Sequence, residues 1–152
     1  MGKSRIRIGL LGCGTVGSAF VDLLESQKST ILLRTGLELV VTHVAVSDLN
    51  KDRPGLDAQT LLTDKPSEVI KHNEVDLVVE LMGGLLPARD LVKAALENNK
   101  PVITANKELL SKEGKYLFAS GRKKCRSSFR SSCCWRYSSD SSPSSVTFGG
   151  AC

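Results

Sequence analysis

The fold is decided by residues 6–17, Ile6-Arg7-Ile8-Gly9-Leu10-Leu11-Gly12-Cys13-Gly14-Thr15-Val16-Gly17. The first six residues form a mostly apolar run typical of a buried parallel strand, and the glycine turn then opens an amphipathic helix expected over 15–26. In this strand-turn-helix setting, G-x-G-x-x-G indicates a phosphate-binding turn. Gly12 permits the tight turn, Gly14 lets a pyrophosphate approach the backbone, and Gly17 lets helix and strand pack closely. The stretch therefore predicts a Rossmann-type dinucleotide-binding domain.

The following hundred residues alternate between strand and helix patterns. Further buried strands are expected at 39–46, 75–81 and 101–104, and further helices at 66–72, 87–98 and 106–120. Turn and helix-start signals such as Pro54-Gly55 and Pro66 separate them. This alternation predicts an α/β fold, a doubly wound parallel sheet with helices on both faces.

The composition of the chain changes near residue 121. Of the 21 Lys and Arg residues, 15 precede this point and balance 15 acidic residues, whereas residues 122–152 hold the other six and only Asp140. The net charge of +5 therefore belongs to a segment rich in Ser, Arg and Cys. We expect a dinucleotide-binding domain at 1–121, with a truncated sheet, and an irregular or disordered tail at 122–152.

The end of the second expected strand bears on the choice of cofactor. Asp48 lies just past it and could accept hydrogen bonds from the ribose hydroxyls of NAD, while Lys51 and Arg53 could hold the extra phosphate of NADP. Alternatively, Asp48 caps a turn and the two basic residues are solvated loop charges. The residues leave these alternatives open.

Two further motifs narrow the family. Val78-Val79-Glu80-Leu81-Met82-Gly83-Gly84 and Val102-Ile103-Thr104-Ala105-Asn106-Lys107 follow the glycine turn along the chain. Together the three motifs resemble homoserine dehydrogenase over about residues 5–120. The resemblance implies NAD(P)-dependent interconversion of L-homoserine and L-aspartate 4-semialdehyde, a step toward threonine, isoleucine and methionine, in an enzyme that is usually homo-oligomeric.

The resemblance also implies a set of site residues. Lys107 is the expected catalytic residue, placed to orient cofactor or substrate oxygens or to polarise the aldehyde, although a lysine there could also be a plain surface residue. The expected cofactor-binding residues are Gly12, Cys13, Gly14, Thr15, Val16, Gly17, Asp48, Met82, Gly83, Thr104 and Lys107. Many family members carry Arg where this chain has Ser47, which weakens an assignment to NADP alone.

The histidines and cysteines predict no metal site. His43 lies within an expected strand and His72 at a polar helix end, so both are expected to be structural or solvated. The tail cysteines, Cys125, Cys133, Cys134 and Cys152, lack paired C-x-x-C spacing, which makes zinc binding improbable.

The family resemblance stops after Ser120, where a substrate-binding, catalytic domain would follow. If the codons for residues 125–138 are read one base out of phase, suitable synonymous codons encode a peptide that resembles the next segment of the family. In that reading Trp135, encoded by TGG, must become Gly. We therefore interpret the tail as a frameshift product, which resequencing of the gene tests. The alternative is a basic tail that binds nucleic acid.

These observations predict a chain that carries the cofactor half of the enzyme and has little activity alone. A different NAD(P)-dependent reductase of a small aspartate-derived metabolite is the alternative. The start of the chain lacks a signal-peptide pattern and no segment is apolar enough to span a membrane, so a cytoplasmic protein is expected.

Overall fold

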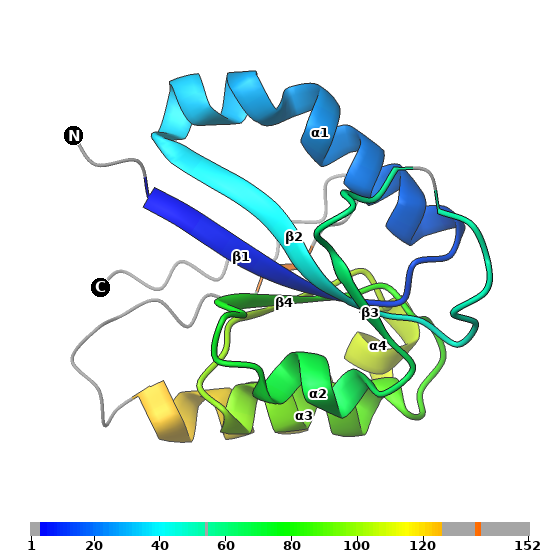
Figure 1. Cartoon of the computed structure of the whole chain (residues 1–152). Helices are drawn as coiled ribbons and strands as arrows, with labels where there is room; N and C mark the ends of the chain where they lie inside the picture. Colours follow the sequence, from blue (N-terminus) through cyan, green and yellow to red (C-terminus); the bar gives the residue numbers. More distant parts are fainter. Residues whose placement is uncertain (1–3, 54, 126–135, 138–152) are drawn as a thin grey trace.

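The computed structural model describes residues 4–53, 55–125 and 136–137 (Figure 1). Their strands are β1 (Ser4–Leu11), β2 (Leu37–Ala45), β3 (Leu61–Thr63), β4 (Leu77–Glu80), β5 (Val102–Thr104) and β6 (Arg136–Tyr137). Their helices are α1 (Thr15–Thr35), α2 (Pro66–Lys71), α3 (Ala88–Glu97) and α4 (Lys107–Cys125). The expected alternation of strands and helices is therefore confirmed.

All strand pairs are parallel, and the sheet order is β3-β2-β1-β4-β5-β6. The chain runs outward from β1 through β2 to β3, then returns to place β4 on the other side of β1. The strand order thus reverses between β1 and β4, and open α/β sheets bind ligands at such a switch point, beyond the carboxyl ends of the strands.

Helices cover both faces of the sheet. Figure 1 shows α1 on one side and α2, α3 and α4 on the other. Ile8 and Leu10 of β1 lie in a core cluster with Val21 of α1, whereas Leu11 lies in a second cluster with Val69 of α2. Burial on both faces explains why the strands are nearly continuous apolar runs.

Helix α1 is longer than expected, and the predicted end at Ser26 was wrong. Its polar residues 25–30 are all exposed, so the apolar period that marks a helix is lost there although the helix continues. It ends where Gly36 adopts a left-handed conformation (φ 70°) and donates its N–H to the Leu32 carbonyl at 2.9 Å. A glycine in this conformation is a common helix terminator.

The edge strand β3 was not predicted. It has three residues and pairs with β2, Leu61 opposite His43 and Thr63 opposite Ala45. A run this short carries no readable alternation, and its conformation depends on the neighbouring strand. The remaining predicted strands and helices differ from the observed bounds by small shifts at their ends, apart from α4.

Helix α4 extends to Cys125, so the expected domain boundary after residue 121 falls within it. β6 pairs with β5, Arg136 opposite Ile103 and Tyr137 opposite Thr104. The rest of the expected tail lies outside the described residues. Within the described part of the chain, no helix combines the length and apolar character needed to cross a membrane.

An ion pair joins β1 to the segment before β4. The backbone N–H of Arg7 donates to Asp76 Oδ2 at 2.9 Å, and its guanidinium donates to both carboxylate oxygens, Nε at 3.0 Å and Nη2 at 3.2 Å. These hydrogen bonds from Arg7 hold the pKa of Asp76 below its ordinary value.

We expect this pair to make stability depend on pH in the acid range. Because the folded pKa of Asp76 is depressed, its contribution is fully present above the unfolded carboxyl pKa of about 4 and is lost as the pH falls through the folded value. The pair is partly exposed, so salt should weaken the effect. Urea unfolding from about pH 6 down to about pH 2.5 should show a shallower loss of stability for Asp76→Asn than for the parent chain; identical slopes would contradict this assignment.

Candidate functional site

The glycine turn joins β1 to α1 and lies against the loop after β4. Gly12 has a φ of 91°, a conformation that favours glycine, and its N–H donates to the Ala45 carbonyl of β2 at 2.9 Å. A Cβ at Gly12 would lie 3.0 Å from the Met82 Cα, and one at Gly17 would lie 2.4 Å from the Gly12 carbonyl oxygen. Close backbone contacts therefore leave little room for a side chain at either glycine.

Gly14 differs from Gly12 and Gly17, because a Cβ there would meet no atom of the described residues within 4 Å, apart from its two chain neighbours. It is the N-cap residue of α1, no side chain caps the helix, and the first turn holds no acidic residue. The first turn of α1 thus has no side-chain cap and the space beside Gly14 is open, and the positive end of the helix dipole there suits an anion. This cradle fits the pyrophosphate of a dinucleotide.

The side chains around the turn divide between core and surface. Val16 is 59% exposed, whereas Cys13 is buried in the cluster that contains Val21, with its Sγ 3.8 Å from the Ser18 Oγ. The sulfur of Cys13 thus faces the core, and only its backbone is available to a ligand at the turn.

A buried carboxylate organises the loop after β4. Glu80 is fully buried, and its Oε1 accepts hydrogen bonds from the backbone N–H groups of Met82 (2.8 Å) and Gly83 (3.3 Å). Its Oε2 accepts a hydrogen bond from the Thr104 hydroxyl at the end of β5. Glu80 therefore holds the backbone of Met82 and Gly83 beside the glycine turn.

Asn106 connects the second and third motifs. Its side-chain oxygen accepts the N–H of Leu109 at 3.1 Å and so caps α4, while its amide nitrogen donates to the Gly84 carbonyl. The Thr104 hydroxyl accepts the backbone N–H of Asn106 at 3.0 Å. Thr104 is fully buried, so its hydroxyl supports the two loops, and the exposed Lys107 begins α4 immediately beyond them.

Asp48 follows β2 in an exposed loop. One carboxylate oxygen accepts the N–H of Asn50 at 2.9 Å, which is a turn-capping contact. Arg53 folds back on the same loop and donates to the carbonyls of Asp48 (2.8 Å) and Lys51 (2.7 Å). Lys51 and Arg53 both line a surface hollow beside β3.

The structure brings the predicted site residues to one edge of the sheet. The glycine turn, Met82 with Gly83, and Lys107 follow the neighbouring strands β1, β4 and β5, and Asp48 follows β2 on the other side of the turn. Two positioning residues, Glu80 and Asn106, were not predicted to belong to the site. A carboxylate in an apolar strand and an Asn directly before a helix were the available signals.

A sheet whose order reverses beside a glycine turn, with an uncapped helix start facing open space, defines a Rossmann-type dinucleotide-binding domain. Residues 12–128 match the family model described as "Homoserine dehydrogenase, NAD binding domain". The chain belongs to this family.

Individual relatives agree with the family match. The homoserine dehydrogenase of Corynebacterium glutamicum is 42% identical over 108 residues, which are 71% of this chain and 24% of the relative. That of Bacillus subtilis is 35% identical over 117 residues, 77% of this chain and 27% of the relative. The crystal structure of a homoserine dehydrogenase from Thiobacillus denitrificans superposes with a TM-score of 0.75 at 42% identity, covering 81% of this chain and 28% of that one. The chain thus spans about a quarter of the length of the relatives it matches.

Proposed function

We propose that this chain binds a nicotinamide dinucleotide, NAD or NADP, at the Gly12–Gly17 turn and forms the cofactor half of a homoserine dehydrogenase. The bound cofactor would supply the hydride that interconverts L-aspartate 4-semialdehyde and L-homoserine. The observation that carries the proposal is the open space at Gly14 in front of the uncapped α1, at the switch point between β1 and β4.

The residues of the turn and the loops have separate tasks in this proposal. The N–H groups of Thr15, Val16 and Gly17 bind the pyrophosphate, and the backbone of Cys13 borders it. Met82 and Gly83 flank the cofactor on the β4 side, and Asp48 faces the ribose on the β2 side. Thr104, whose hydroxyl is engaged by Glu80 and Asn106, contributes its backbone and the position of its loop.

Cofactor binding is tested by titrating the purified 152-residue chain with NADPH and NADH and following the fluorescence of the reduced nicotinamide. Saturable binding of either compound supports the proposal, and their relative affinities decide between the ribose contact of Asp48 and the phosphate contacts of Lys51 and Arg53. No binding of either compound by a chain that is folded by circular dichroism would contradict it.

Lys107 is the residue we propose to act on the reacting groups. In a chain extended by the family's catalytic domain, we expect Lys107→Met to lower kcat/KM for homoserine oxidation by about 100-fold, because an ammonium ion that orients or polarises substrate oxygens is lost. Lys112→Met is the matched control, since Lys112 is exposed on the same helix and pairs with Glu108. Equal activity in both variants would remove Lys107 from the mechanism.

A second candidate function is reduction of another small aspartate-derived metabolite with the same cofactor. A panel of aldehyde and keto substrates, offered to the extended chain, separates the two candidates. For the 152-residue chain alone we expect little turnover, with residues 1–121 as the cofactor domain. The complete enzyme is proposed to be a homo-oligomer in the cytoplasm.

A further inference from the structure

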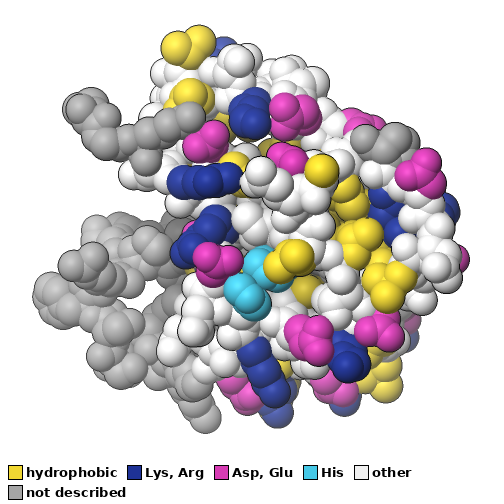
Figure 2. Space-filling model, in the orientation of Figure 1, with side chains coloured by type: hydrophobic (Ala, Val, Ile, Leu, Met, Phe, Trp, Pro, Cys, Tyr) yellow, Lys and Arg dark blue, Asp and Glu magenta, His cyan; other side chains and the backbone are white. Residues whose placement is uncertain are grey.

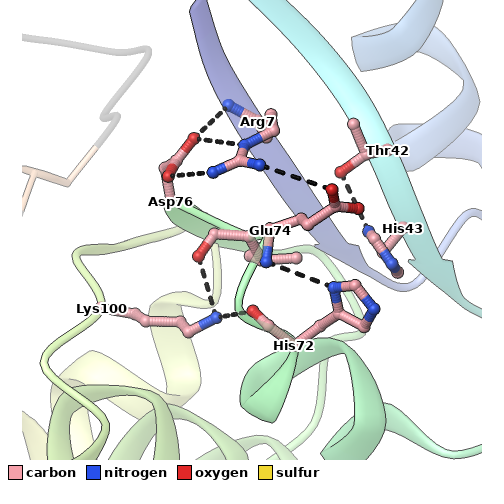
Figure 3. Close-up of polar contacts among 8 residues, drawn as sticks. Arg7, Thr42, His43, His72, Glu74, Asp76 and Lys100 are labelled. Carbon is pink, nitrogen blue, oxygen red and sulfur yellow. Dashed lines mark hydrogen bonds and ion pairs between the residues drawn. The ribbon is translucent and has the colours of Figure 1, made fainter.

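Two histidines and a glutamate meet where β2 passes the turn between α2 and β4. His43 lies on β2, His72 follows the last residue of α2, and Glu74 lies two residues further on. One potential ligand atom from each of the three lies within 4.8 Å of the others, and the two imidazole centroids are 4.0 Å apart. Figure 3 shows both rings and the Glu74 carboxylate grouped together between the strand and the turn.

One ring nitrogen of His43 has no hydrogen-bond partner among the residues that the structure describes. The residue is 6% exposed, its Nδ1 lies 3.0 Å from the Thr42 hydroxyl, and the unpartnered nitrogen is its buried Nε2. A buried nitrogen without a partner costs free energy, so such an atom calls for an explanation. An imidazole held through one nitrogen with the other free is the usual arrangement of a histidine that binds a metal ion.

The backbone around Glu74 is held from two sides. Lys100 donates to the carbonyls of His72 and Val75, the latter at 2.8 Å, and Arg7 is engaged by Asp76. The remaining contact of Arg7 with the Glu74 carboxylate is long, at 3.7 Å. The positive charges of Arg7 and Lys100 would repel a bound cation, but the carboxylates of Glu74 and Asp76 offset them.

The site is reachable from the protein surface. His43 and Glu74 both line a surface pocket, and Figure 2 shows the histidine side chains as one patch on the visible face.

We propose that His43, His72 and Glu74 form a binding site for a divalent transition-metal cation, with water in the remaining position. Two imidazoles and a carboxylate suit Zn²⁺ or Ni²⁺ rather than Mg²⁺ or Ca²⁺. Tetrahedral Zn²⁺ needs ligand atoms about 3.3 Å apart, so the side chains must rotate to close the site. His72 must also release the Glu74 N–H, which donates to its Nδ1 at 3.3 Å, because a metal-bound imidazole has no second acceptor nitrogen. The site precedes β4, at the opposite end of that strand from the Met82 loop, so it is independent of the cofactor turn.

The test is calorimetric titration of the full, tag-free chain with Zn²⁺, carried out with serine at the four tail cysteines, because thiolates also bind zinc. We expect one equivalent of Zn²⁺ to bind and to raise the Tm, since the ion ties β2 to the turn in the folded state. The chain has only two histidines, so both imidazole signals in a ¹H–¹⁵N spectrum should shift together.

Variants identify the ligands. His72→Gln and Glu74→Gln should each weaken Zn²⁺ binding at least about tenfold, whereas Glu25→Gln, an exposed glutamate on α1, should not. Because Glu74 is exposed, we expect Glu74→Gln to fold, so this variant tests the site even if His72→Gln does not fold. Absence of stoichiometric binding in the parent, or unchanged affinity in Glu74→Gln, would overturn the proposal.

Discussion

Replacing Gly14 by alanine should weaken binding of the nicotinamide dinucleotide at least about tenfold while changing the unfolding free energy by less than about 1 kcal/mol. Beyond the two adjacent residues, the added methyl group meets no atom of the described part of the chain within 4 Å, so we expect the fold to tolerate it. It does occupy the space through which a pyrophosphate approaches the start of α1. Fluorescence titration gives the affinity, and urea unfolding gives the stability.

Gly17→Ala is the contrasting variant. Its Cβ would lie 2.4 Å from the Gly12 carbonyl oxygen, which is backbone and has little freedom to move. We expect a loss of at least about 2 kcal/mol, because the clash outweighs the gain in helix propensity. If both variants lost the same unfolding free energy, the open space beside Gly14 would not distinguish it from Gly17.

Glu80→Ala should destabilise the chain by at least about 3 kcal/mol. The substitution leaves a cavity at a fully buried position and removes the acceptor for the N–H groups of Met82 and Gly83 and for the Thr104 hydroxyl. Glu80→Gln should lose less, because its amide oxygen can still accept the two N–H groups. Urea unfolding followed by circular dichroism measures both.

Glu25→Ala is the control for this comparison. Glu25 is exposed on α1 and forms an i,i+3 pair with Lys28 at 3.6 Å, so its loss should change stability by no more than about 0.5 kcal/mol. If Glu80→Ala were as mild as this control, the hydrogen bonds of Glu80 would not hold the loop as we describe.

The site was predictable where its residues are close in sequence. The glycine turn and the motif ending at Lys107 are each a short continuous segment. Each lies between a strand and a helix that are adjacent in the sequence. The links between motifs were not predictable, because Glu80 and Thr104 are 24 residues apart and Asn106 and Gly84 are 22 apart. The two histidines, expected to be separate structural or solvated residues, contact each other across 29 positions of the chain for the same reason.

The sequence by itself determined the α/β alternation, the glycine turn and the family, because apolar periodicity and short motifs are local properties of the chain. Only the tertiary structure decided the edge strand β3, the full length of α1, the buried Glu80 that joins two loops, and the meeting of His43, His72 and Glu74. Each of these depends on which strands lie side by side. The physical reason is that hydrogen bonds to a neighbouring strand, and contacts across a sheet, arise only once the chain is folded.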